Sequence, residues 1–142
     1  MLLEQIAELK QIGELSGKIV LKRVLSSDPL RVEATVKDSG NILGVEVISD
    51  VGTYISQVRP DGGYYDQGEG YFMTSDNETV VWKGSGLGKI KEDGGFSYRG
   101  ILYHKTESQK LARLNTTPVL LNMKWIPKTK PKRRCGSGNS NL

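Results

Sequence analysis

Glycine and aromatic residues recur at every second position over residues 68–90, which read GEGYFMTSDNETVVWKGSGLGKI. An alternation with a period of two is typical of β-strands, because successive side chains of a strand point to opposite faces of the sheet. The polar cluster SDN interrupts this alternation at its centre, and such clusters favour turns. The stretch therefore predicts a β-hairpin with one face made of glycine and aromatic side chains.

The register of this hairpin follows if Ser75, Asp76 and Asn77 form a three-residue loop with Asn77 in the left-handed region. A slip by one residue would mix the two faces, so the alternation selects this register over its neighbours. The predicted pairs are Gly68 with Gly84, Gly70 with Trp82, Phe72 with Val80, and, on the opposite face, Glu69 with Lys83.

The glycines of the second strand do not predict a phosphate-binding loop. Such a loop leads into a helix and ends in a lysine followed by serine or threonine, whereas here Ile90 follows Lys89. Two structural reasons for the glycines remain open: they allow a strand to curve as a barrel closes, or they leave volume inside for a ligand or waters.

Turn signals recur along the rest of the chain at the spacing of an all-β barrel or sandwich. We expect about eight antiparallel strands closed into a barrel. The expected strands are residues 19–25, 31–37, 42–51, 53–58, 64–74, 79–90, 96–105 and 117–126, with turns at 26–29, 38–41, 60–63 and 92–95 and one or two helical turns within 107–114.

The two ends of the chain differ from this pattern. Residues 1–16 contain apolar residues at helical spacing and predict a short N-terminal helix, which precedes a barrel domain over 17–126. Residues 127–142, which read PKTKPKRRCGSGNSNL, are almost free of apolar residues and predict a disordered basic tail. The tail is either a solvated appendage or an electrostatic contact for anionic partners.

Charge and composition exclude several classes of function. Six of the 20 lysine and arginine residues follow position 123, and all 16 acidic residues precede position 108, so the predicted barrel is slightly acidic. We therefore expect nucleic-acid binding only through Lys128–Arg134, if at all. A single histidine, His104, and a single cysteine, Cys135, argue against a His- or Cys-based metal site. We expect no cofactor, no membrane insertion and a cytoplasmic location.

Candidate ligand-binding residues come from the glycine and aromatic face and its continuation over residues 96–104. The alternative is that the same rings form only the core of a small domain. A polar set for an enzyme of the isomerase or cyclase kind would need Glu69, Arg99, Tyr98 and His104 to point inward together. Six carboxylates are expected in or beside turns: Asp38, Asp50, Asp61, Asp76, Glu92 and Asp93. The candidates are Tyr54, Phe72, Trp82, Tyr98, Arg99 and His104; no catalytic residue is assigned.

The runs GFSYRG at 95–100 and TESQKLARLN at 106–115 resemble a family of small archaeal and bacterial β-rich proteins without an assigned activity. The motifs RPDG at 59–62 and GEG at 68–70 fit the same resemblance, which covers about residues 17–123. The family is in turn remotely similar to barrels of the allene-oxide-cyclase or lipocalin type. The resemblance implies a β-rich fold, and the basic tail departs from it.

Three functions follow as hypotheses. The first is a module that binds a small apolar or amphipathic ligand inside the barrel. The second is an isomerase- or cyclase-type enzyme that uses the same interior. The third is a protein- or nucleic-acid-interaction domain that acts through the basic tail. We favour the first, because the glycine and aromatic face is the most distinctive feature of the sequence.

Overall fold

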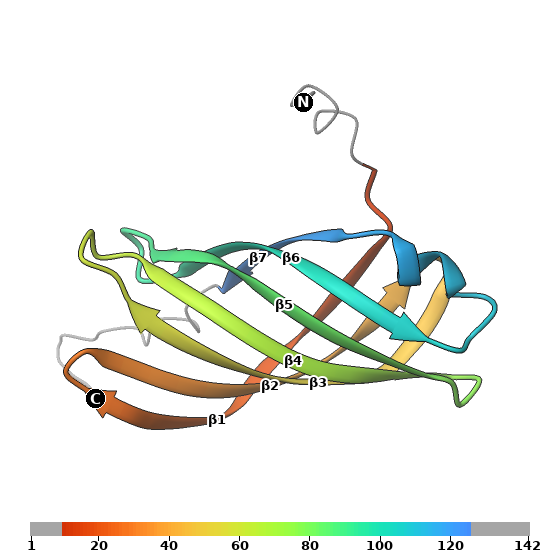
Figure 1. Ribbon diagram of the computed structural model, residues 1–142, viewed down its shortest axis with the longest axis horizontal. Coiled ribbons are helices and arrows are strands. Elements are labelled where there is room, and N and C mark those ends of the chain that lie inside the picture. Colours follow the sequence, from red (N-terminus) through yellow and green to blue (C-terminus); the bar gives the residue numbers. More distant parts are fainter. Residues whose placement is uncertain (1–9, 126–142) are drawn as a thin grey trace, which may run out of the picture.

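The computed structural model describes residues 10–125, which form one antiparallel sheet of seven strands in chain order (Figure 1). Each strand pairs only with its neighbours in sequence, so the sheet is a simple meander. The elements are β1 (Gly13–Ser27), β2 (Leu30–Ile42), β3 (Val45–Val58), β4 (Tyr64–Thr74), β5 (Thr79–Ile90), β6 (Phe96–Thr106), the 3₁₀ helix η2 (Ala112–Thr116) and β7 (Val119–Trp125). No helix within residues 10–125 has the length and apolar character needed to cross a membrane.

The predicted hairpin register is confirmed. Gly70 pairs with Trp82, Gly68 with Gly84 and Glu69 with Lys83. Asn77 has a positive φ of 66°, and its amide donates to the carbonyl of Thr74. The glycine and aromatic positions of β4 and β5 therefore share the concave face of the sheet, which we call the inner face.

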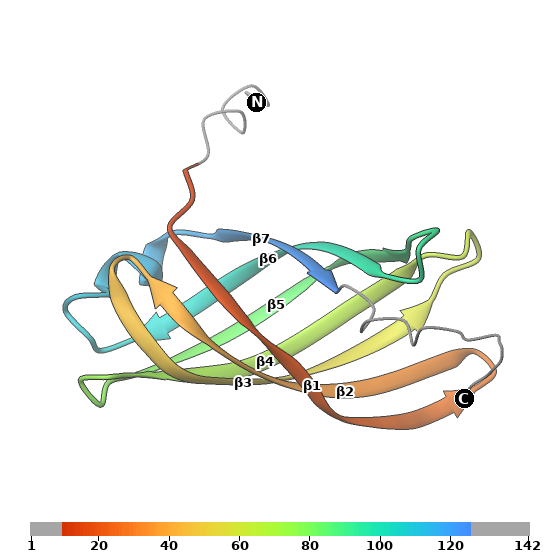
Figure 2. The same ribbon diagram turned by 180° about the vertical axis from the view of Figure 1, so that it is seen from behind.

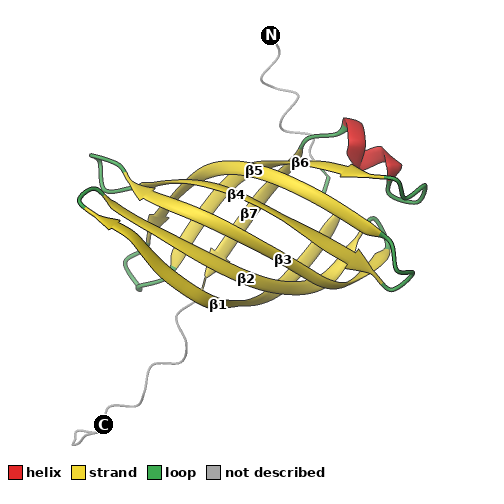
Figure 3. Ribbon diagram, turned by 60° about the horizontal axis from the view of Figure 1, so that its bottom comes forward, coloured by secondary structure: helices red, strands yellow, loops and turns green. Residues whose placement is uncertain are grey.

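The sheet curls strongly but does not close, so the prediction of an eight-stranded barrel is wrong (Figure 3). Residues 42–51 and 53–58, expected as two strands, form the single strand β3, and Gly52 continues it in register with Val36 and Gly70. An odd number of strands in a meander makes β1 and β7 run in the same direction, so antiparallel closure is not available to them. Within residues 10–125 no pairing joins β1 to β7.

One predicted turn is also displaced. Residues 38–41 belong to β2, and the chain turns at Leu43 and Gly44, which have φ angles of 53° and 77°. Positive φ at both central residues is the geometry of the two-residue hairpin loop whose twist matches the sheet, and a glycine at the second position favours it. The turn residues of 38–41 are instead accommodated as a register shift between Asp38 and Gly40.

The predicted N-terminal helix is not present where the structure describes its residues. Residues 13–16 begin β1 and pair with residues 39–42 of β2, since strand pairing and inner-face packing outweigh a weak local preference for helix. The remainder of that prediction, residues 1–9, and the tail 127–142 lie outside the described residues.

The apolar core fills one end of the curled sheet, which we call the capped end. The segment between β6 and β7, which contains η2, inserts the fully buried Leu111 and Leu114 against Val47, Phe72 and Val80. Hydrogen bonds fix the segment in place: the Ser108 hydroxyl donates to Oε1 of Glu78 over 2.7 Å, and the side chain of Asn115 bonds both backbone polar groups of Thr106. The helical turn expected within 107–114 is present, displaced toward the chain's C-terminus at Ala112–Thr116.

The opposite end, which we call the open end, carries the turns at residues 28–29, 59–63 and 91–95. Near the capped end β1 and β7 lie close together, where Leu15 and Val119 pack against the same core. From there the two edge strands diverge, as the opposite views in Figures 1 and 2 show. The inner face is therefore shielded at one end and bordered by two unpaired edges at the other.

Candidate functional site

Aromatic rings cover several of the inner-face glycines. A Cβ would stand 2.6 Å from the indole of Trp82 if placed on Gly70 and closer still if placed on Gly52, and one on Gly68 would stand 2.5 Å from the ring of Tyr54. Non-bonded carbon atoms do not approach so closely, so these positions accept only glycine without rearrangement. The glycines thus make room for the rings that cover them.

Five of the six candidate residues lie on the inner face: Tyr54, Phe72, Trp82, Tyr98 and His104. Tyr54 packs against two of the others, since its ring centroid is 5.8 Å from that of Trp82 and 6.3 Å from that of Tyr98. Arg99 is exposed and pairs with Leu87 on the outer face, away from the other five.

Two carboxylates face each other on the inner face beside this aromatic group. Asp38 of β2 and Asp50 of β3 are direct cross-strand partners, and both lie within strands rather than in turns, contrary to the expectation from the sequence. Trp82 donates its indole N–H to Oδ1 of Asp50 over 2.8 Å. Burial and the nearby charge of Asp38 raise the pKa of Asp50 to about 6, although the hydrogen bond from Trp82 acts to lower it. Burial also raises the pKa of Asp38.

A third inner-face carboxylate, Asp66 of β4, lies farther toward the open end. Its side chain is 4% exposed, and its Oδ1 atom is buried without a hydrogen-bond partner among the described residues. Burial raises its pKa, and a hydrogen bond with Ser56, its cross-strand partner on β3, acts in the opposite direction. Asp50 thus has a structural partner in the Trp82 indole, whereas one oxygen of Asp66 has none.

The two tyrosines between these carboxylates have raised pKa values. Burial, followed by the charges of Asp50 and Asp38, raises the pKa of Tyr54. Burial and the charge of Asp66 raise the pKa of Tyr98 to about 12. Both phenols are therefore neutral at physiological pH, and the strip from Asp38 to Asp66 combines carboxyl groups with aromatic rings. We call these six residues the inner strip: Asp38, Asp50, Tyr54, Asp66, Trp82 and Tyr98.

No ion pair within residues 10–125 neutralises the carboxylates of the inner strip. The ion pairs of this part of the chain are Arg23–Glu33 and Lys110–Asp76, and both are on the surface. The same residues contain no cluster of three side chains suited to hold a metal ion.

His104 of β6 is the cross-strand partner of Trp82 on β5. Its ring packs at 66° to that of Phe72, with the centroids 6.2 Å apart. Its Nδ1 atom is buried without a hydrogen-bond partner, and burial lowers the pKa of the imidazole. The side chain is thus a neutral ring in the aromatic packing at physiological pH.

The polar set considered for an isomerase or cyclase is not brought together. Tyr98 and His104 point inward, whereas Glu69 and Arg99 are exposed on the outer face. The carboxylates Asp38, Asp50 and Asp66 are the functional candidates that the sequence reasoning missed. For Asp66 a signal was present, because it lies two and four residues before Gly68 and Gly70 and therefore shares their face.

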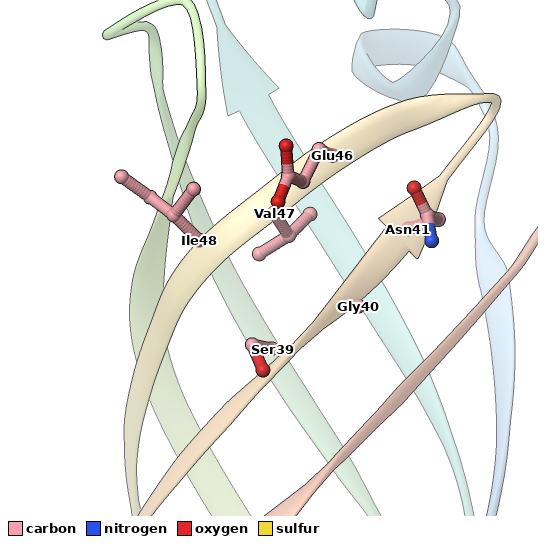
Figure 4. Close-up of a pocket in the computed structure, with 6 residues that line it drawn as sticks. All are labelled: Ser39, Gly40, Asn41, Glu46, Val47 and Ile48. Atoms are coloured by element: carbon pink, nitrogen blue, oxygen red, sulfur yellow. The ribbon is translucent and has the colours of Figure 1, made fainter.

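A separate depression of about 440 Å³ lies between β2 and β3 where their register shifts (Figure 4). It is open to solvent, and Glu46 is the one ionisable residue that lines it. None of the inner-strip residues contributes to it. The lining residues are Ser39, Gly40, Asn41, Glu46, Val47 and Ile48.

Comparison with known proteins gives no relative: no family model matches the chain, and neither does any curated protein or any solved structure.

Proposed function

We propose that the protein is a binding module that holds a small amphipathic ligand on the inner face of its curled sheet. The observation that carries this proposal is the inner strip, where aromatic rings surround carboxylates that no described residue neutralises. Ligand sites combine apolar and aromatic walls with a few polar groups that orient the ligand, and the inner strip has this composition.

The contrast between the two ends of the sheet supports this assignment. The capped end is sealed by Leu111 and Leu114 and contains buried apolar residues. Toward the open end, Asp66 lies between Ser56 and Gly86, and the edge strands β1 and β7 do not pair. A core that served stability alone would not need a carboxylate there, because burying an unpaired charge destabilises a fold.

The fold alone does not identify a ligand, and the proposal rests on this site rather than on any similarity. A cytoplasmic location belongs to the same proposal, and its support is the single cysteine, which is compatible with a reducing compartment. The functions considered for the basic segment Lys128–Arg134 remain predictions, since that segment lies outside the described residues.

Titration with a neutral apolar fluorophore, N-phenyl-1-naphthylamine, tests the proposal. We expect saturable enhancement of its emission, and loss of that enhancement in Ser56→Leu, which places a bulky group beside Asp66 on the inner face. Gln67→Leu is the matched control, because Gln67 is exposed on the outer face of the neighbouring strand. No saturable signal, or equal loss in both variants, would refute binding on the inner face.

A further inference from the structure

The unpartnered oxygen of Asp66 points to the charge of the ligand. A buried carboxylate in a protein normally has hydrogen-bond or ionic partners, and a single unsatisfied group calls for an explanation. Asp66 is 4% exposed, its Oδ1 has no partner, and neither of the ion pairs of residues 10–125 includes it. Its position is therefore suited to a partner that is not part of residues 10–125.

The immediate surroundings of Asp66 are small and aromatic. Across the sheet its neighbours in register are Ser56 on β3 and Gly86 on β5, and Gly86 pairs in turn with Gly100 on β6. The Tyr98 hydroxyl lies over both glycines, 2.8 Å and 2.9 Å from where their Cβ atoms would stand. The row beside Asp66 thus has no side chains of its own, and the phenol of Tyr98 covers it.

Rings and carboxylate together favour an organic cation. A ligand ammonium group gains from the negative faces of aromatic rings and from a charge-assisted hydrogen bond to a carboxylate. Tyr54 and Tyr98 pack edge to face at 65° next to this row. An anionic head group would instead meet the charge of Asp66, and of Asp38 and Asp50 farther along the strip.

A divalent metal ion fits this position less well than an ammonium group. Ca²⁺ and Mg²⁺ require about six oxygen ligands in a defined geometry. Residues 10–125 provide no group of three histidine, cysteine, aspartate or glutamate side chains close enough to share an ion. A single carboxylate with a hydroxyl and aromatic rings is sufficient for an alkylammonium group.

We propose that Asp66 anchors the ammonium group of an amine-bearing amphipathic ligand, with Ser56, Tyr54 and Tyr98 around it. This inference rests on the proposed function and specifies the ligand's head group. The alkyl part of the ligand would extend along the inner strip toward Trp82, which lies between Asp66 and the capped end.

The test compares three probes that share a ten-carbon chain and differ in head group: decylammonium, 1-decanol and decanoate. Their dissociation constants are measured at pH 7 by displacement of N-phenyl-1-naphthylamine and by isothermal titration calorimetry, below the concentrations at which the probes aggregate. We expect decylammonium to bind at least tenfold more tightly than either of the others. The Asp66→Asn variant should lose this tenfold preference and keep its affinity for 1-decanol.

Glu69→Gln is the matched control, because it removes a carboxylate from the exposed face of the same strand. It should leave all three affinities unchanged. Comparable or tighter binding of 1-decanol or decanoate to the natural sequence would overturn the inference and leave the proposed function intact. Failure of all three probes to bind would instead remove the proposed function itself.

A second readout does not depend on any variant. In ¹H–¹⁵N spectra of the unaltered protein, decylammonium should shift the amides around Ser56, Asp66 and Gly100 more than 1-decanol does. Shifts confined to the outer face, or identical for both probes, would contradict an anchor at Asp66.

Discussion

Replacing Asp50 by asparagine is expected to stabilise the protein at neutral pH and to leave its stability unchanged in acid. Asparagine keeps an oxygen that accepts the Trp82 N–H and removes the buried charge that faces Asp38. The pKa of Asp50 rises from 3.8 to about 6 in the folded state. The folded state therefore binds the proton more tightly than the unfolded state does, which favours folding at low pH.

The size of the effect follows from that difference. A shift of about two pKa units corresponds to about 3 kcal/mol between the two protonation states. The contribution of Asp50 to the free energy of unfolding is fully present below pH 3.8 and is lost as the pH rises through about 6. The free energy of unfolding of Asp50→Asn should hence be higher than that of the natural sequence by up to about 3 kcal/mol at pH 8, and the two should be equal at pH 3.

Urea unfolding followed by far-ultraviolet circular dichroism at pH 3, 5, 6.5 and 8 measures this difference. The comparison at each pH cancels the opposite contribution of His104, whose lowered pKa costs stability as the pH falls through its ordinary value of 6.5. At pH 8 the free energy of unfolding should rise less in Asp50→Leu than in Asp50→Asn, because leucine leaves the Trp82 N–H donor without its acceptor. A variant that is less stable at pH 8, or a difference that does not change with pH, would refute the reasoning.

Three further predictions concern the packing of the sheet. Gly70→Ala should lower the free energy of unfolding by about 1–3 kcal/mol, because its Cβ would overlap the backbone carbonyl of Val51 and the Trp82 ring. Thermal melts should show no comparable loss for Gly63→Ala, whose nearest atom would be 3.2 Å away. Leu114→Ala should cost about 2–5 kcal/mol through the cavity it leaves at the capped end, measured by urea unfolding, and a smaller loss would show that the cap closes over it. Lys110→Ala should leave the melting temperature within error, since its ion pair with Asp76 is on the surface.

Local features of the sequence predicted most of the sheet. The register of β4 and β5 follows from the SDN loop and the alternation beside it, and both are properties of neighbouring residues. The turns at residues 60–63 and 92–95 are also present, with Gly62 and Gly94 at positive φ. At these two turns the sequence correctly identified the segment in which a glycine adopts positive φ.

The wrong predictions concern competition between distant segments. DSGN at residues 38–41 contains stronger turn residues than Leu43, yet the turn forms at Leu43-Gly44, where the pairing of β2 with β3 continues to Ile42 and Val45. Closure of the barrel depends on the number and direction of all strands together. Merging two expected strands into β3 changed that number from even to odd, which no local pattern reveals.

For the candidate site, the sequence predicted the inner-face position of the aromatic residues. Tyr54, Phe72, Trp82, Tyr98 and His104 follow from alternation within each strand. Asp38 and Asp50 did not, because aspartate is common in turns and the turn at 38–41 was misplaced. Their role on the inner face becomes visible only when the two strands are paired.

The unpaired edge of β1 has a consequence for behaviour at high concentration. A free strand of this length exposes a row of amide and carbonyl groups that could join the edge of another molecule and start aggregation. Two bulges, after Ile19 and after Val24, break that row, and Lys18, Lys22 and Arg23 place like charges along it. The chain can thus leave its sheet unclosed and still resist stacking edge to edge.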